Sequence, residues 1–417
     1  MRLVATTAAF SCTGLLGCGL LVGNDRYQPA SGESSSGDAS AGSTAVLEDA
    51  DTADPGSDDV VEPGPESTST GSNSGSDDTA GPLEWWDSQW RFRRRVEFEA
   101  TMDDQVADFT FRVDIVGDEE SGLFKEDGSD IRFIRGDGEM LPYELEGWGL
   151  EGSPTIAWVR VPLLGGDDAT EVTMYYGNPS ASAPASEAVF SDSHVGVWHL
   201  DDRGDSSIKD NQVNPGSGRF GPSTISYGLP VATGGIPISI PTNGFAPEAS
   251  GSGLTISAWV FIEDSPTDTA VLYSRAASPD EPGFTVTVNV ESQNLEVERF
   301  GAGGTQPYTA TFENVVTIGE WQYIVVRFDP MTGARLHVNE ESYDALTEGS
   351  LPIASPVTAE TPVAFGGFSF MPHATFQGIF DEVRVSNVQR SARWIRYHYV
   401  SSQGLLATMP NQEEFPG

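Results

Sequence analysis

The feature that most limits how this chain can fold is a long segment without aromatic residues. From Gln28 to Glu84 there is no phenylalanine, tyrosine or tryptophan, and Ser, Gly, Asp, Ala, Thr and Pro dominate. Residues 19–82 carry 13 acidic side chains and one basic side chain. Such a segment cannot bury enough apolar surface to offset its conformational entropy. We therefore predict a disordered acidic tether at residues 18–84 and a folded part that begins near Trp85.

The residues before this segment have the pattern of an export signal. Arg2 is followed by an apolar stretch that is too short for an ordinary membrane span. Leu15-Leu16-Gly17-Cys18 resembles a bacterial lipobox, with a leucine three places before the cysteine and a small residue directly before it. The resemblance implies that residues 1–17 are a signal peptide and that Cys18 carries a lipid anchor. It places the protein in the bacterial cell envelope, at the outer membrane or the cell surface. The alternative is an ordinary secretory signal whose cysteines have no role.

Charge and cysteine content narrow the class of partner. The formal net charge is −40, so the phosphates of a nucleic acid would be repelled and we expect no nucleic-acid partner. The same acidity favours solubility and divalent cations. The two cysteines, Cys12 and Cys18, both lie near the N-terminus, so the folded part has no disulfide framework.

Residues 85–194 predict a first β-sandwich. The run "TFRVDIV" alternates, with Phe111, Val113 and Ile115 on one face and polar residues on the other. "TIAWVRVPLL" and "EVTMYYGNP" are further strand candidates. The blocks "WWDSQWRFRRRVEF", "DGSDIRFIRGDGEMLPYELEGW" and "VTMYYGNPSA" resemble, in this order, a domain of unknown function from bacterial surface proteins. That domain commonly precedes a LamG-like domain.

Residues 195–403 predict a second sandwich. "GLTISAWVFI" is strongly apolar, "GFTVTVNV" alternates, and "GEWQYIVVRFDPMTGARLHVNEE" indicates two strands joined by a turn. With "VGVWHLDD" and "GIFDEVRVSNVQRSARWIRYHYVSSQ", these blocks resemble a LamG-like jelly roll of the concanavalin A-like lectin and glucanase superfamily. The resemblance implies that the first and last strands, "VWHLDD" and "GIFDEVRV", lie side by side. Residues 404–417 then form a C-terminal tail, and the fold class is all-β with two antiparallel β-sandwich domains.

The sequence lacks the patterns that would indicate catalysis. Residues 85–417 have no Glu-x-Asp-x-x-Glu strand, which places the carboxylates of glycosidases with this fold on one face. A Gly-x-Ser-x-Gly elbow is also absent. The histidines show no metal-ligand spacing such as His-x-x-x-His. We therefore predict no catalytic residue and no enzymatic activity.

The adjacent residues Asp381 and Glu382 lie in the predicted last strand, where their side chains point to opposite faces. They cannot act as a direct acid–nucleophile pair. The alternation places Asp381 on the face of Ile379, Val383 and Val385, where a carboxylate needs a partner. Glu382, on the opposite face, is expected to tolerate replacement by Gln with little loss of stability.

Two kinds of partner are open for Asp381. One is a hydrogen-bond donor, either a backbone N–H group or an arginine. The other is a calcium ion, which the resemblance implies because many LamG-like domains bind calcium. In that case the segment "DDRGDSSIKDN" would supply further oxygen ligands from Asp201, Asp205 and Asp210.

These inferences describe a lipid-anchored surface protein whose LamG-like domain binds a glycan or a protein without catalysis. A structural or adhesive spacer of the envelope is the alternative, and a divergent glycosidase is the third, because fold alone does not fix function. Trp85, Trp86 and Trp148 are flanked by Gly, Asp or Glu, and they either stack on sugar rings or pack at sheet edges.

Overall fold

The computed structural model describes the folded part of the chain. The described residues are 84–99, 105–115, 122–149, 155–165, 170–185, 188–223, 225, 227–240, 253–264, 267–301, 308–349, 351 and 361–416. The predicted signal peptide, Cys18 and the tether up to residue 83 lie outside them. Strands dominate the described residues, which contain one α-helix, α1 (Ala392–Ser402). The predicted all-β fold class is confirmed.

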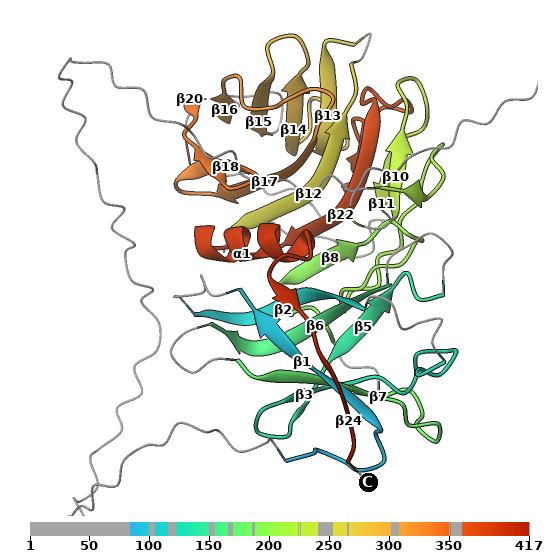
Figure 1. Ribbon diagram of the computed structural model, residues 1–417. Coiled ribbons are helices and arrows are strands. Elements are labelled where there is room, and N and C mark those ends of the chain that lie inside the picture. Colours follow the sequence, from blue (N-terminus) through green and yellow to red (C-terminus); the bar gives the residue numbers. More distant parts are fainter. Residues whose placement is uncertain are drawn as a thin grey trace, which may run out of the picture. The chain divides into compact units, whose positions relative to one another are not determined.

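The N-terminal half, β1 to β7, contains two antiparallel sheets (Figure 1). The first sheet has the order β23-β1-β7-β3-β4, with β24 also paired to β1. Its strands are β1 (Phe92–Phe98), β3 (Arg132–Arg135), β4 (Met140–Leu141), β7 (Val172–Tyr176), β23 (Ala407–Thr408) and β24 (Gln412–Glu414). The second sheet has the order β2-β6-β5 and consists of β2 (Val106–Ile115), β5 (Tyr143–Glu146) and β6 (Thr155–Leu164). As predicted, Phe111, Val113 and Ile115 are buried in one apolar cluster, together with Phe133 and Met174 of the first sheet.

Residues 404–416, in the segment predicted as a C-terminal tail, are not a tail. They return to the first sheet, where Thr408 of β23 pairs with Glu97 of β1 in antiparallel register. Leu406 and Met409, on either side of this contact, are buried in the apolar cluster of the N-terminal half. Strands of two and three residues leave no readable alternation, so the sequence pattern did not reveal them.

The C-terminal half, β8 to β22, is a sandwich of two antiparallel sheets. One sheet has the order β19-β18-β17-β12-β22-β10-β9, with β8 also paired to β22. Its strands are β8 (His194–Trp198), β9 (Gly221–Pro222), β10 (Tyr227–Val231), β12 (Leu254–Ile262), β17 (Trp321–Asp329), β18 (Gly333–Val338), β19 (Glu341–Tyr343) and β22 (Gly378–Ser386). Trp198 of β8 pairs with Val383 of β22, which confirms that the first and last strands lie side by side.

The other sheet of the sandwich has the order β11-β21-β13-β14-β15-β16-β20. Its strands are β11 (Ile238–Ile240), β13 (Thr269–Arg275), β14 (Gly283–Asn289), β15 (Asn294–Phe300), β16 (Tyr308–Phe312), β20 (Leu346–Glu348) and β21 (Val363–Phe365). Buried side chains from both sheets, such as Ile256, Val286 and Phe365, fill the space between them. This apolar layer is the core of the C-terminal half.

The central strand β12 is buried on both faces, as its nearly continuous apolar sequence favours. Ile256 and Val260 point into the sandwich, whereas Trp259 points to the other side. Helix α1 covers that other side and lies between the sandwich and the N-terminal half (Figure 1). Its Tyr399 stacks on Trp259 with ring centroids 5.7 Å apart. Trp259 belongs to the same apolar cluster as Phe111 of β2, so the two halves share a core.

Helix α1 has clear start and stop signals, although the strand pattern did not predict it. The side chain of Ser391 accepts a hydrogen bond from the backbone N–H of Trp394 at 3.1 Å, which caps the first turn. Gly404 follows the helix with a φ of +71°, where glycine avoids the strain of a Cβ atom. In the described part of the chain, no helix has the length and apolarity needed to cross a membrane.

Candidate functional site

Strand β22 contains a β-bulge at the acidic pair. Between the register pairs Arg384–Ser257 and Asp381–Trp259, β22 has one residue more than β12. Glu382, next to Asp381 in this bulge, has a φ of +49°, which is uncommon for a residue with a Cβ atom. The extra residue shifts the alternation of side chains along the strand.

The bulge corrects the predicted faces of β22. Phe380, Val383 and Val385 point into the sandwich core. Asp381 lies opposite Trp259, and directly opposed residues of two strands point to the same face. The prediction that Asp381 shares a face with Val383 and Val385 is therefore wrong. Asp381 points toward the layer between the two halves.

Asp381 is fully buried and acts as a hydrogen-bond acceptor. Its Oδ2 atom accepts from the hydroxyl of Ser223 and from the backbone N–H of Ile225, the latter at 3.2 Å. Burial raises the pKa of Asp381 well above its ordinary value, and the charge of Glu382 adds to this effect. These contacts match the first alternative for Asp381, in which its partner is a hydrogen-bond donor. They attach the segment after β9 to β22.

The residues predicted as calcium ligands, Asp381 with Asp201, Asp205 and Asp210, do not converge on one site. Asp381 is enclosed behind Ser223 and Ile225, whereas Asp201 and Asp210 line surface hollows. Within the described ranges, the ligand atoms that converge within 4.8 Å of one another belong to Glu146, His199 and Glu382. The oxygen-only calcium set therefore does not fit this geometry.

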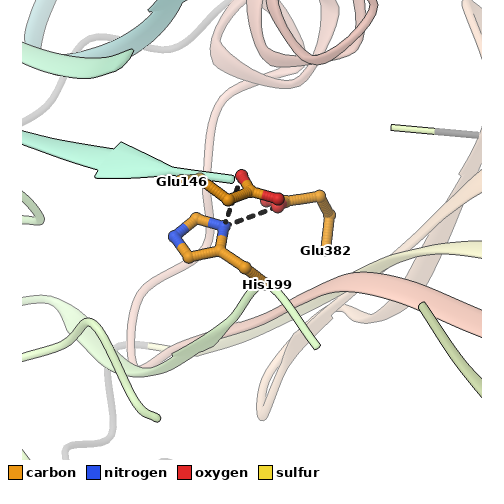
Figure 2. Close-up of side chains that lie close together, drawn as sticks. All are labelled: Glu146, His199 and Glu382. Atoms are coloured by element: carbon orange, nitrogen blue, oxygen red, sulfur yellow. Dashed lines mark hydrogen bonds and ion pairs between the residues drawn. The ribbon is translucent and has the colours of Figure 1, made fainter. Parts of the chain in front are cut away.

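A buried charged cluster surrounds His199. We call it the seam cluster, and it consists of Glu144, Glu146, His199, Glu382 and Arg384. Nδ1 of His199 lies 2.5 Å from Oε1 of Glu382 and 3.5 Å from Oε2 of Glu146 (Figure 2). Nε2 of His199 lies 2.7 Å from Oε1 of Glu144. Glu144 and Glu146 share one face of β5, His199 follows β8, and Glu382 stands in the bulge of β22. Both halves of the protein thus contribute to the cluster.

Neighbouring donors hold the two deepest carboxylates in place. Nε1 of Trp158 donates to Oε2 of Glu146 at 2.8 Å, and Nη2 of Arg384 donates to Oε2 of Glu382 at 2.8 Å. The guanidinium of Arg384 lies 4.5 Å from the ring centroid of Trp158 and 4.8 Å from that of Phe190. Oε1 of Glu146 is buried and has no hydrogen-bond partner.

The two buried carboxylates of the seam cluster have pKa values that are shifted in opposite directions. Burial favours the protonated form of Glu382, but the positive charges of His199 and Arg384 outweigh it and lower the pKa to about 2. Burial raises the pKa of Glu146 to about 7, with His199 opposing and Glu382 adding to the rise. Burial disfavours the charged form of His199, yet Glu382 and Glu146 raise its pKa well above the ordinary value. At neutral pH, Glu382 is ionised, and the raised pKa of His199 favours its protonated form.

A hollow of about 190 Å³ opens beside the seam cluster. It adjoins a larger hollow of about 560 Å³, and the two have Glu144, Asp205 and Ser206 in common. We call them together the acidic hollow. The side chain of Glu144 is 27% exposed, whereas those of Glu146 and Glu382 are 1% and 0% exposed. Of these three carboxylates, Glu144 is therefore the one most accessible to a ligand in the hollow.

The three tryptophans that the sequence left open pack against their own domain. The ring of Trp85 lies 5.6 Å from that of Tyr175, and the ring of Trp86 lies 5.7 Å from it. Trp148 lies 5.7 Å from Phe124, edge to face. These contacts correspond to the edge-packing alternative.

Sequence reasoning missed His199 and Glu146 as members of a site. The predicted pairing of "VWHLDD" with "GIFDEVRV" was a signal that His199 lies near Glu382. No local pattern connected these strands with β5, because the approach of Glu146 depends on how the two halves pack.

Comparisons with known proteins agree with this architecture. The family model described as "Concanavalin A-like lectin/glucanases superfamily" matches residues 233–396, and the model described as "Domain of unknown function (DUF2341)" matches residues 127–211. No curated protein matches the sequence.

Solved structures with partial likeness include two from botulinum neurotoxins. They are the receptor-binding domain of botulinum neurotoxin D, with 13% identity and a TM-score of 0.39, and the binding domain of botulinum neurotoxin DC in complex with rat synaptotagmin II, with 12% identity and a TM-score of 0.41. The matches cover 50% and 51% of this chain and 52% of each neurotoxin chain, so this chain spans about half the length of those structures. Likeness at these scores carries no argument about function. The two family models show that the chain contains a DUF2341 domain followed by a LamG-like, concanavalin A-like domain.

Proposed function

We propose that this protein is a lipid-anchored protein of the bacterial cell envelope that binds a glycan or another protein without catalysing a reaction. The observation that carries the proposal is the acidic hollow, which both halves of the protein build. Its larger part, about 560 Å³, lies within the usual volume range of ligand sites. The match to a lectin and glucanase superfamily supports a carbohydrate ligand.

The lining of the acidic hollow favours a neutral, hydroxyl-rich ligand. Glu144, Asp201 and Asp210 offer carboxylate oxygens that accept hydrogen bonds from sugar hydroxyls. Tyr143 and Ile208, which is 49% exposed, offer apolar surface for a sugar ring. The same carboxylates would repel uronic or sialic acids. A basic segment of a partner protein is the second ligand that this charge pattern fits.

The burial of the deeper carboxylates supports binding over hydrolysis. A glycosidase needs an acid and a nucleophile or base that flank the scissile bond. The pKa of Glu146 resembles that of a general acid, but its side chain is only 1% exposed. Glu382 is fully buried and bonded to both His199 and Arg384. Release of reducing sugar from envelope polysaccharide by the purified protein would contradict this assignment.

A glycan array tests the binding function. The full chain should be used, since residues 195–403 share a core with the N-terminal half and would expose it if isolated. We expect neutral glycans to bind and acidic glycans to fail. Ile208→Glu should weaken binding at least tenfold. Leu346→Glu, at a 61% exposed position on β20, is the matched control and should leave binding unchanged. Silence on the array together with self-association would favour the spacer alternative.

The lipid anchor has its own test, because Cys18 lies outside the described residues. Cys18→Ser should abolish incorporation of labelled palmitate and release the protein into the soluble fraction. A wild-type protein that takes up no label, together with a variant that stays in the membrane fraction, would contradict the proposal.

A further inference from the structure

The seam cluster has the donor set of a metal centre. We propose that it binds one divalent transition-metal ion, with Zn²⁺ as the best fit, through Nδ1 of His199 and the carboxylates of Glu146 and Glu382. The ion would join the two halves, because Glu146 belongs to β5 and the other two ligands belong to the C-terminal half. This inference does not depend on the ligand of the acidic hollow.

One of the two carboxylate distances to Nδ1 of His199 matches a tetrahedral site, and the other is about 1 Å shorter. Zinc bonds of 2.0–2.2 Å place neighbouring ligand atoms about 3.4 Å apart. Oε2 of Glu146 lies 3.5 Å from Nδ1 of His199, which matches this spacing. Oε1 of Glu382 lies 2.5 Å from the same nitrogen, a distance suited to a shared proton. Replacing that proton by an ion requires the two side chains to separate by about 1 Å.

The contacts around the three ligands are those that orient metal ligands in proteins. Glu144 accepts from Nε2 of His199, which keeps a proton on Nε2, so that loss of the proton shared with Glu382 would expose the lone pair of Nδ1 to a metal. Trp158 and Arg384 each donate to one oxygen of a ligating carboxylate. Partners of this kind fix ring and carboxylate orientation in metal sites.

An unsatisfied atom points independently to a ligand. Oε1 of Glu146 has no hydrogen-bond partner, and the side chain is 1% exposed and borders the acidic hollow. Buried polar atoms are nearly always paired, so this oxygen requires a proton, a water molecule or a cation.

Charge balance favours a dication. Once the ion has displaced the protons of His199 and Glu146, the carboxylates of Glu144, Glu146 and Glu382 contribute −3 and Arg384 contributes +1. A divalent ion compensates the remaining −2. The imidazole nitrogen favours zinc or another transition metal over calcium, which prefers oxygen ligands alone. The hollow beside Glu146 leaves space for water as a fourth ligand.

Metal uptake by the full chain tests the proposal. Protein purified in detergent, treated with EDTA and dialysed is titrated with ZnCl2, and bound zinc is measured by calorimetry and elemental analysis. Cobalt replacement adds a spectroscopic test, since tetrahedral Co²⁺ with one nitrogen and several oxygen ligands absorbs in the visible range. We expect one equivalent of zinc, a higher melting temperature on loading, and no competition by excess calcium.

Glu146→Gln is the decisive variant, because glutamine keeps the volume and the acceptor for Trp158 but loses the charge. It should weaken zinc binding at least tenfold and remove the thermal response, while its circular dichroism in EDTA matches the wild type. Asp210→Asn, which changes an acid of the hollow outside the seam cluster, is the control and should bind zinc normally. Absence of stoichiometric zinc, preference for calcium, or unchanged affinity in Glu146→Gln would overturn the proposal. None of these outcomes bears on the glycan-array result.

Discussion

Replacing Glu382 by Gln should destabilise the protein substantially, contrary to the expectation from strand alternation alone. The side chain is fully buried and accepts from both His199 and Arg384. Glutamine has nearly the same shape, so the change removes one charge and little packing. Two buried cations then lose their closest common counter-charge.

The expected destabilisation by Glu382→Gln can be worked out in two ways. Lowering the pKa of Glu382 from 4.5 to about 2 corresponds to about 3 kcal/mol at 1.36 kcal/mol per pKa unit. Breaking a buried ion pair by removing one partner typically costs 3–5 kcal/mol. For the ~340 residues from Thr79 to Gly417, an unfolding entropy of about 2.1 cal/mol/K per residue converts 3 kcal/mol into a shift of about 4 °C.

Thermal unfolding in EDTA, followed by circular dichroism between pH 3 and pH 8, measures this effect. A carboxylate with a depressed pKa stabilises the fold fully above its unfolded pKa and loses that contribution as the pH falls through its folded pKa. The difference in the free energy of unfolding between wild type and Glu382→Gln should therefore be constant above about pH 5 and shrink to less than half of that value by pH 3. Glu144→Gln is the matched control, since this partly exposed carboxylate also bonds His199 and should cost less than about 1 kcal/mol.

A difference in melting temperature below about 1 °C between wild type and Glu382→Gln at neutral pH would refute the reasoning, because it would mean that the buried charge does not stabilise the fold. A gap that persists undiminished at pH 3 would also refute it, since loss of packing would then explain the effect better than loss of charge.

Three further predictions concern stability. Asp381→Asn should change the free energy of unfolding by less than about 1 kcal/mol, because burial raises the pKa of the native carboxyl and so reduces its difference from an amide. Added calcium should leave the melting temperature unchanged, since Asp381 is bonded to Ser223 and Ile225. Deleting residues 405–417 removes the buried Leu406 and Met409 and should cost about 3–6 kcal/mol in denaturant unfolding; an unchanged midpoint would contradict the role of β23. In metal-free protein, burial raises the pKa of Glu146 from 4.5 to about 7, so the native state keeps a proton that the unfolded state has already released. The free energy of unfolding should therefore fall by about 3 kcal/mol between pH 4.5 and pH 8, and Glu146→Gln should remove most of this pH dependence.

Sequence periodicity by itself determined the fold class and most strands. Alternating side chains place Phe111, Val113 and Ile115 on a buried face of β2, and the run of apolar residues in β12 reflects a strand covered on both sides. These features are local, because the pleat of a strand repeats every two residues. The lipobox at Cys18 is also a property of the sequence alone, and it stays a prediction.

Tertiary structure alone decided the site. One extra residue at Glu382 reverses the alternation of β22, and nothing in the strand's composition marks that bulge. Glu146 and His199 meet Glu382 from distant segments, since the halves pack through a shared core around α1. Arg112 shows the same effect, because it belongs to the predicted polar face of β2 but is buried where it donates to the Ser402 carbonyl at 2.6 Å. A face that is polar in one sheet becomes interior when a second body covers it, and only the packing of distant segments determines where that occurs.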